Sequence, residues 1–145
     1  MADCLFCGIV AGTVPAFQVV DSPDGIGFLD IRPVFKGHVL VVPRPHVPQL
    51  TDLDAKLLPG FFALVQRVAA AVPAALGAQG SFVAMNNVVS QSVPHLHAHV
   101  VPRTKGDGLR GFFWPRTKYA SDDEAVSYAE RIGKDLAGPG VTPGG

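Results

Sequence analysis

The chain has 145 residues and balances 12 lysine and arginine residues with 12 aspartate and glutamate residues. Its length suits one domain with its own hydrophobic core, and its zero net charge excludes a general attraction to nucleic acid or to an anionic membrane. Gln66, Arg67 and Pro73 interrupt the longest apolar run, Leu57 to Leu76, which argues against a membrane span, and the start MADCLF lacks the pattern of a signal peptide. We therefore predict a cytoplasmic protein that partners neither a membrane nor a specific nucleic-acid sequence.

Short apolar runs bounded by turn residues predict strands. They are rich in β-branched residues and too short for helices. The turn residues 21–25 join the first two runs as in a hairpin. The five predicted strands are residues 16–20, 26–31, 37–42, 81–85 and 93–101.

Two longer segments predict helices. Residues 54–76 keep apolar residues at helical spacing after Thr51, a candidate N-cap, although Pro59 and Pro73 should blunt or kink the helix. Residues 121–136 begin with a serine that can cap a helix and continue with three acidic residues in the first turn.

The order of these elements predicts an α+β fold, because strands in adjacent runs with one intervening helix do not form alternating βαβ units. We expect an antiparallel sheet of about five strands with one long helix packed on it, and a further helix near the C-terminus. One domain would span residues 1–138, and the Gly- and Pro-rich tail 139–145 is expected to be disordered.

Three histidines alternate with apolar residues in the segment PHLHAHVVP. His95, His97 and His99 would share one face of a strand, because strand side chains point alternately to opposite faces. A chance cluster on a solvated face is the plain alternative. One metal bound by all three is disfavoured, because the outer Cα atoms would lie about 13 Å apart and zinc–nitrogen bonds are about 2.0–2.1 Å long. Two of the three could still bind zinc with distant ligands, as in a zinc hydrolase.

A neutral imidazole is a competent nucleophile toward phosphorus at cytosolic pH, since its reference pKa is about 6.5. The attacking nitrogen must be unprotonated, so the other ring nitrogen has to donate its hydrogen to a fixed acceptor such as a backbone carbonyl. Neighbouring strand residues supply such carbonyls. The segment is therefore a candidate for nucleophilic catalysis at a phosphate.

The only two cysteines, Cys4 and Cys7, form a C-x-x-C pair near the start of the chain. In a reducing cytosol such a pair is more often a metal or redox site than a structural bridge. A thioredoxin-like role would place the pair after a strand and at the start of a helix, and the three residues before Cys4 leave no room for that strand.

The histidine motif, preceded by QSV and followed by Pro-Arg, resembles the signature of the histidine triad (HIT) superfamily of nucleotide hydrolases and transferases. The segment FLDIRPVFKGHVLVVPRPHV resembles the family's middle region, so the resemblance spans Cys4 to about Arg103. It implies two displacements at a nucleotide α-phosphate, through a nucleotidyl-histidine intermediate on His97. The implied substrates are nucleoside phosphoramidates or dinucleoside polyphosphates. No catalytic metal is implied, although a polyphosphate could arrive as its Mg²⁺ complex.

The resemblance also implies roles for residues around this nucleophile. His99 and His38 would order and polarise the site, and Ser92 and Gln91 would contact phosphate and leaving-group oxygens. Asp30 would hold the ribose hydroxyls, although it could equally form a turn. The apolar pocket for a base, which we expect to be a purine, would consist of Leu5, Phe6, Phe28 and Ile31. The last three of these could also be ordinary core residues.

The loop before the histidine motif is shorter than the glycine-containing loop of many family members. Asn86 directly follows the predicted strand 81–85. It is therefore the asparagine that we expect to contact the nucleotide, with Asn87 as the alternative.

The resemblance to the HIT superfamily implies a zinc site as well. Some HIT proteins and related nucleotidylyltransferases bind zinc through two N-terminal cysteines, a histidine after the middle strand and the first triad histidine. The matching residues here are Cys4, Cys7, His46 and His95, which would complete a closed tetrahedral site with a structural role. Two buried free thiols and a surface histidine are the alternative.

The segment after the triad mixes basic and aromatic side chains, including Trp114. The resemblance suggests that this segment sets leaving-group specificity, often across a homodimer, and a solvated loop is the alternative. Two other functions stay open: a nucleotide-binding regulator with little turnover, and a zinc hydrolase that uses two triad histidines.

Overall fold

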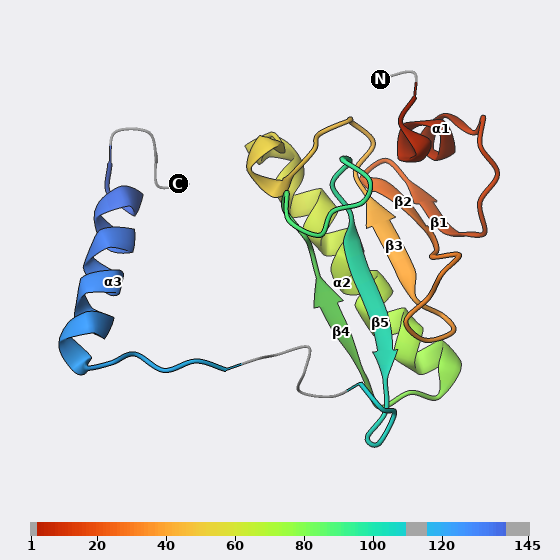
Figure 1. Cartoon of the computed structure of the whole chain (residues 1–145). Helices are drawn as coiled ribbons and strands as arrows, with labels where there is room; N and C mark the ends of the chain where they lie inside the picture. Colours follow the sequence, from red (N-terminus) through yellow and green to blue (C-terminus); the bar gives the residue numbers. More distant parts are fainter. Residues whose placement is uncertain (1–2, 110–115, 139–145) are drawn as a thin grey trace. The chain divides into compact units, whose positions relative to one another are not determined.

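The protein is described by a computed structural model over residues 3–109 and 116–138, and its central feature is a five-stranded antiparallel sheet (Figure 1). The strand order is β1-β2-β3-β5-β4. The predicted α+β class and its sheet of about five strands are therefore confirmed. The strands are β1 (Gln18–Ser22), β2 (Gly25–Leu29), β3 (Val39–Val42), β4 (Gly80–Ala84) and β5 (Ala98–Arg103), and the helices are α1 (Leu5–Ala11), α2 (Leu58–Leu76) and α3 (Asp122–Leu136).

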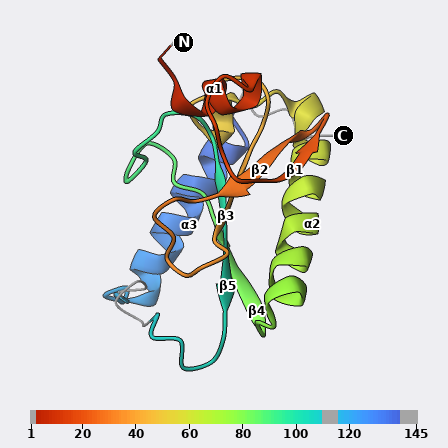
Figure 2. The same cartoon turned by 90° about the vertical axis from the view of Figure 1, so that its right-hand side faces the viewer.

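Each face of the sheet carries its own hydrophobic layer, because successive strand residues point to opposite faces. On β3, Val39 and Val41 belong to the layer that contains α2, whereas Leu40 and Val42 belong to the layer that contains α1. Figure 2 shows α2 along one side of the sheet. The α2 layer includes Phe61, Leu64, Val65, Val68, Val72, Leu96, Ala98 and Val100, and the α1 layer includes Phe6, Ile9, Ile26 and Phe28.

The long helix begins four residues later than predicted, at Leu58. Two short 3₁₀ turns precede it, and Thr51 lies inside the first of them rather than at an N-cap. Pro59 falls at the start of the helix, where a missing N–H has no consequence. Pro73 lies inside the helix without ending it, and the helix stops at Gly77, whose φ of 69° is the left-handed conformation that glycine adopts readily.

The segment from Ala55 to Leu76 is the one stretch of the described residues that is long and apolar enough to cross a membrane by length and composition alone. In this fold apolar residues of the segment serve the core instead, because Phe61, Leu64 and Val68 lie buried against the sheet. The cytoplasmic location stays a prediction.

The helix α1 was not predicted from the sequence. Cys4 is its N-cap residue, and the Cys4 Sγ accepts the N–H of Cys7 at 3.5 Å. The C-x-x-C pair therefore does stand at the start of a helix, as a thioredoxin-like arrangement would require, although the described residues contain no strand before it.

The predicted strand 93–101 is shorter than expected at its start, because β5 begins only at Ala98. In the preceding segment the N–H of His95 donates to the carbonyl of Val93, and the N–H of Leu96 donates to the carbonyl of Val47 at 2.7 Å. These bonds replace a strand ladder. The predicted alternation still holds, because Leu96, Ala98 and Val100 all lie in the layer that faces α2.

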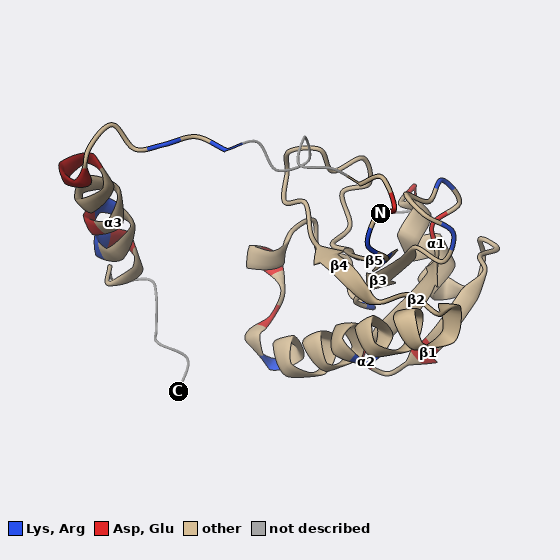
Figure 3. Ribbon diagram, turned by 90° about the horizontal axis from the view of Figure 1, so that it is seen from below, with Lys and Arg blue, Asp and Glu red and all other residues tan. Residues whose placement is uncertain are grey.

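The chain divides into two compact units, Met1–Asp107 and Gly108–Gly145. The second contains α3, where the Ser121 side chain accepts the N–H of Glu124 and caps the helix as predicted. Figure 3 shows charges of both signs along this helix. A single domain over residues 1–138 stays a prediction, and Trp114 and the tail 139–145 lie outside the described residues.

Candidate active site and metal site

His97 lies just before β5, and the residue is only 6% exposed. Its Nδ1 is 2.7 Å from the carbonyl oxygen of His95. Because a carbonyl can only accept, Nδ1 carries the hydrogen, and the lone pair of the neutral ring is on Nε2. This is the tautomer that a nucleophilic histidine requires.

His38 and His99 form a hydrogen-bonded pair, and the ring of His99 lies next to that of His97. The N–H of Val34 donates to Nδ1 of His38 at 3.1 Å, so the hydrogen of the neutral His38 ring is on Nε2. That Nε2 lies 3.0 Å from Nδ1 of His99 and donates to it. The hydrogen of His99 is then on its Nε2, and its ring centroid is 5.0 Å from that of His97.

Burial keeps this pair neutral. Together with smaller contributions from the nearby rings of His97 and His38, it lowers the pKa of His99 to about 4. Burial also lowers the pKa of His38, while the carboxylate of Asp30 opposes that shift. Both rings are therefore uncharged at neutral pH and act as hydrogen-bond donors and acceptors.

Asp30 stands at the end of β2, beside His38. One carboxylate oxygen accepts the N–H of Arg32 at 2.8 Å, and the other is 3.7 Å from Nδ1 of His38. Asp30, His38 and His99 lie close enough to be considered as a metal site. Both ring nitrogens of His38 are already hydrogen-bonded, Nδ1 to the N–H of Val34 and Nε2 to His99. His38 therefore has no free lone pair for a metal, and we do not treat these three residues as a metal site.

A cleft of about 230 Å³ opens beside His97. Its wall contains every residue predicted to surround the base, together with Asp30, Ser92 and His99. Ile31 is 80% exposed, so it covers the rim rather than the floor. The predicted base-pocket residues in the wall are Leu5, Phe6, Phe28 and Ile31, and the wall residues that the sequence analysis missed include Ile9, Val14, Leu40 and Val93.

Phe6 is the central aromatic residue of this cleft. Its ring lies edge-on to His97 with centroids 5.1 Å apart, and edge-on to Phe28 at 5.3 Å. It also contacts the ring of His95 at 6.0 Å. Phe6 thus connects α1, β2 and the histidine segment.

Two residues predicted to bind substrate have side chains engaged elsewhere. The amide nitrogen of Gln91 donates to the carbonyl of Pro48, and its oxygen accepts the N–H of Val88. Asn86 donates to the carbonyl of Ser90, whereas Asn87 accepts the N–H of Leu50. The amides of Gln91 and Asn86 retain further donors and lone pairs, and their contacts with substrate stay predictions.

A larger cavity, of about 660 Å³, lies between α2 and strands β1 to β3. Its lining is apolar apart from Arg67 and contains no histidine, cysteine or carboxylate among the described residues. It therefore lacks the groups for acid–base or nucleophilic chemistry, and the smaller cleft at His97 is the candidate active site.

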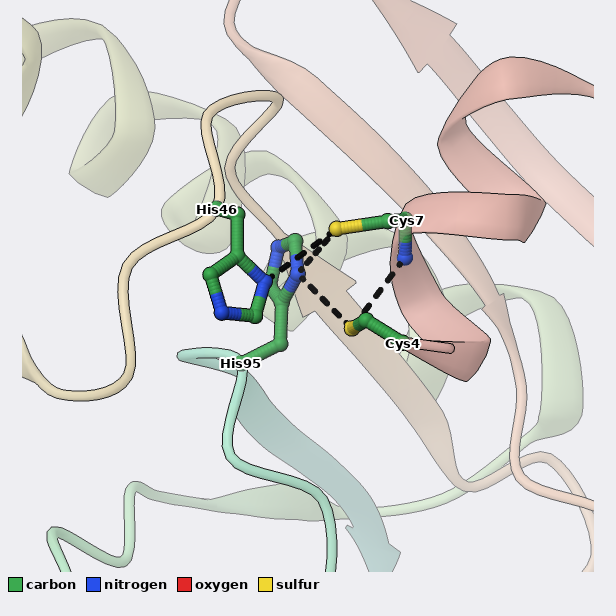
Figure 4. Close-up of side chains that lie close together, drawn as sticks. All are labelled: Cys4, Cys7, His46 and His95. Atoms are coloured by element: carbon green, nitrogen blue, oxygen red, sulfur yellow. Dashed lines mark hydrogen bonds between the residues drawn. The ribbon is translucent and has the colours of Figure 1, made fainter. Parts of the chain in front are cut away.

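Cys4, Cys7, His46 and His95 converge next to the cleft (Figure 4). The Cys7 Sγ is 3.1 Å from Nδ1 of His46 and 3.5 Å from Nδ1 of His95, and the Cys4 Sγ is 3.6 Å from the same His95 nitrogen. Zinc bonds of about 2.3 Å to sulfur and about 2.0–2.1 Å to nitrogen at tetrahedral angles would place such donors about 3.5 Å apart. The four residues thus fit a tetrahedral metal ion.

The protonation of His95 agrees with this fit. Its Nε2 is 3.0 Å from the carbonyl oxygen of Pro43 and donates to it, which leaves Nδ1 free to bind a metal. His95 is fully buried, and burial lowers its pKa. Burial raises the pKa of the Cys7 thiol, so in the absence of a cation this thiol is held in its neutral form.

Comparison with known proteins places the chain in a family. The family model for the HIT domain matches residues 11–106. The chain belongs to the HIT family. The adenosine 5'-monophosphoramidase hnt1 of Schizosaccharomyces pombe is 32% identical over 135 residues, which cover 92% of this chain and 98% of the relative.

Two solved HIT structures are similar in fold. A HIT family member from Bacillus subtilis has a TM-score of 0.82 at 32% identity and covers 94% of this chain and 99% of its own. A Zn-bound histidine triad family protein from Mycobacterium smegmatis has a TM-score of 0.71 at 36% identity, with coverage of 94% and 99%. The HIT fold predicted from the sequence is thereby confirmed.

Proposed function

We propose that this HIT protein is a nucleotide hydrolase or nucleotidyl transferase that cleaves at the α-phosphate through a covalent intermediate on His97. The observation that carries the proposal is the bond from Nδ1 of His97 to the carbonyl oxygen of His95, because it leaves the Nε2 lone pair for attack. The similarity to an adenosine 5'-monophosphoramidase supports the same class of reaction.

In the first displacement, Nε2 of His97 forms a bond to the α-phosphorus as the bond to the leaving group breaks. The ring becomes positively charged, and the hydrogen bond to the His95 carbonyl then strengthens, because a charged donor binds its acceptor more tightly. In the second displacement water or another acceptor attacks the phosphorus and His97 departs as a neutral ring. The neutral His38 and His99 pair adds no positive charge that would oppose the imidazolium.

The cleft beside His97 suits a nucleoside. Phe6 and Phe28 offer apolar surface for a base, and Asp30 offers a carboxylate that can accept from two adjacent ribose hydroxyls. The cleft offers the base few groups that would read its edges, so we expect a loose preference among purines. A Mg²⁺ complex of a polyphosphate substrate stays a prediction.

We infer that the cysteine and histidine cluster binds a structural Zn²⁺. Its four donors fit a closed tetrahedral site with no open position for water, which favours a structural role over a catalytic one. The Zn-bound relative from Mycobacterium smegmatis supports the choice of metal. Cys4, Cys7, His46 and His95 would hold the ion, which would fix α1 against the histidine segment.

Intact-protein mass spectrometry can test the reaction. The protein is incubated with an adenosine phosphoramidate, or with a dinucleoside polyphosphate, and quenched in base, which preserves a phosphorus–nitrogen bond. We expect a mass increase of one adenylyl group in the wild type and none in His97→Ala. The absence of both adduct and turnover would favour a nucleotide-binding regulator, whereas turnover that survives in His97→Ala but is lost to chelators would favour a zinc hydrolase.

We also infer a homodimer, formed through β4. This strand lies at one end of the sheet, and Val83 on it is 44% exposed. At the opposite end, β1 has an irregular register between Gln18 and Val20, a feature that discourages edge-to-edge pairing. Light scattering should give twice the 15.2 kDa chain mass. Val83→Lys should yield monomers, and the matched change Val19→Lys on β1 should not.

A further inference from the structure

The C-x-x-C pair has the geometry of a reactive dithiol as well as that of a metal-binding pair. The two Sγ atoms lie within 4.8 Å of one another, and Cys4 stands at the start of α1 with Cys7 one turn later. Both cysteines are only partly buried, which is consistent with access by a small solute such as a peroxide. A disulfide requires its sulfur atoms to approach to about 2.05 Å, which is a small movement for two side chains of neighbouring helical turns.

We propose that Cys4 and Cys7 are a reversible oxidation site, at which a peroxide converts the zinc-binding thiols into an intramolecular disulfide and releases the metal. The proposal rests on the proposed zinc site, and its effect on nucleotide binding rests on the proposed function. His46 and His95 would be left as a pair of neutral nitrogen donors, too few to retain zinc at a closed site.

The oxidation is balanced with hydrogen peroxide as the oxidant. One thiolate sulfur attacks a peroxide oxygen, the oxygen–oxygen bond breaks, and a sulfenic acid and one water form after proton uptake. The second thiol then attacks the sulfenic sulfur, and the sulfur–oxygen bond breaks as the sulfur–sulfur bond forms. The second water carries away the hydroxyl group. Two thiols and one peroxide therefore give one disulfide and two waters.

Oxidation of the cysteines would alter the cleft beside His97 through Phe6. This residue lies between the two cysteines in the sequence, and its buried ring packs edge-on against both His97 and Phe28. Leu5, the other residue between the cysteines, also lines the cleft. Closing a disulfide changes the first turn of α1 and removes its link to His95, so the wall that would hold the base shifts.

The test uses zinc-loaded wild-type protein and hydrogen peroxide. Zinc release is followed with a coloured chelator, the intact mass by mass spectrometry, and AMP affinity by calorimetry. We expect one zinc released for each disulfide, a mass loss of two hydrogens, and an AMP Kd that rises about ten-fold, the upper value of one aromatic contact. Dithiothreitol followed by zinc should restore both the mass and the affinity. Because the chain has only two cysteines, the mass identifies the bond.

Cys4→Ser is the matched control, because it retains one thiol that can gain oxygen but cannot close the ring. Zinc release with oxygen addition, or with disulfides between chains, would overturn the oxidation site, and so would zinc retention under peroxide. A disulfide that leaves AMP affinity unchanged would overturn the link to the cleft. Failure of the reduced, zinc-loaded protein to bind AMP would contradict the proposed function. The zinc and mass measurements would then still decide whether the dithiol is an oxidation site.

Discussion

Nδ1 of His97 lies 2.7 Å from the carbonyl oxygen of His95, two residues earlier in the same chain. The bond fixes the tautomer of His97 and the rotation of its ring in one contact. Because His95 is itself a member of the cysteine and histidine cluster, the orientation of the proposed nucleophile depends on how that cluster is held.

This contact predicts that two conservative variants of His97 will differ. In His97→Asn the side-chain amide nitrogen can replace Nδ1 and donate to the His95 carbonyl, whereas His97→Gln places its amide one bond further out. Both variants should lose the nucleotidyl adduct, and turnover should fall by about 10⁴-fold or more. His97→Gln should also lose about 1 kcal/mol of unfolding free energy in urea, because a buried carbonyl loses its donor. Equal stability of the two variants would contradict the assigned tautomer.

Acidification should destabilise the protein through His99. Its pKa is lowered from 6.5 to about 4, chiefly by burial, so below pH 6.5 the unfolded chain binds a proton that the folded chain excludes. Stability is therefore complete above pH 6.5 and is lost as the pH falls toward 4, with a slope of about 1.4 kcal/mol per pH unit for one proton.

The measurement compares wild type with His99→Asn at equal zinc loading. The asparagine oxygen can still accept from Nε2 of His38, but the side chain does not titrate. Unfolding midpoints between pH 7.5 and 5 should fall more steeply in the wild type. Parallel curves would mean that His99 is not the group responsible.

Asp30→Asn should weaken binding of the ribose while leaving the local turn intact. The asparagine oxygen can still accept the N–H of Arg32, which Asp30 accepts at 2.8 Å. The lost charge should raise KM for an adenosine phosphoramidate by about ten-fold, as expected for a hydrogen bond to a charged group. A 2',3'-dideoxy substrate should show little change in steady-state kinetics. An equal effect on both substrates would point to a general disturbance of the cleft.

The cysteine and histidine cluster predicts about one zinc per chain in metal-replete protein. Cys4→Ser removes one of four ligands and should reduce the zinc content and the melting temperature together, because metal binding adds to folding stability. Elemental analysis and calorimetry measure both quantities. Less than a few tenths of a zinc in wild type, unchanged by Cys4→Ser, would show that the four residues do not form a zinc site.

Val88 occupies a conformation that suits glycine. It has a φ of 71°, and its β-branched side chain is 69% exposed, so packing does not offset the strain. Val88→Gly should therefore raise the unfolding free energy by about 0.5–1 kcal/mol. Val89, the next residue, is similarly exposed without a positive φ, so Val89→Gly should lower stability. A loss in both variants would show that the strain at Val88 is negligible.

Residue patterns alone were sufficient to predict the sheet and the two longer helices, because periodicity reports directly on which face of an element is buried. The grouping of the cleft residues came from the resemblance to the HIT family, since no periodicity joins Leu5 to Phe28. The sequence was insufficient for α1, since seven residues are too few to show a helical repeat. It also could not reveal that β5 starts at Ala98, because Leu96 pairs with Val47, a residue distant in the chain. Such pairing depends on the tertiary structure.

The side-chain contacts in the loop before the histidines were even harder to predict from the sequence. Gln91 and Asn86 were predicted to contact substrate, yet their amides bind backbone groups of Pro48 and Ser90. Amide side chains satisfy whichever partners the loop conformation provides, and that conformation includes positive φ values at Val88 and Ser90. No pattern in the residue types signals those angles.

The pairing of β3 with β5 has a consequence for how the chain can evolve. Leu40 stands opposite His99, and Val39 stands opposite Val100. A slip of one residue in this register would exchange the two faces of β5, and His99 would enter the apolar layer under α2 while Val100 turned toward His38. Insertions and deletions within β3 or β5 should therefore be absent among active descendants, whereas the loop after Arg103 is free to vary in length.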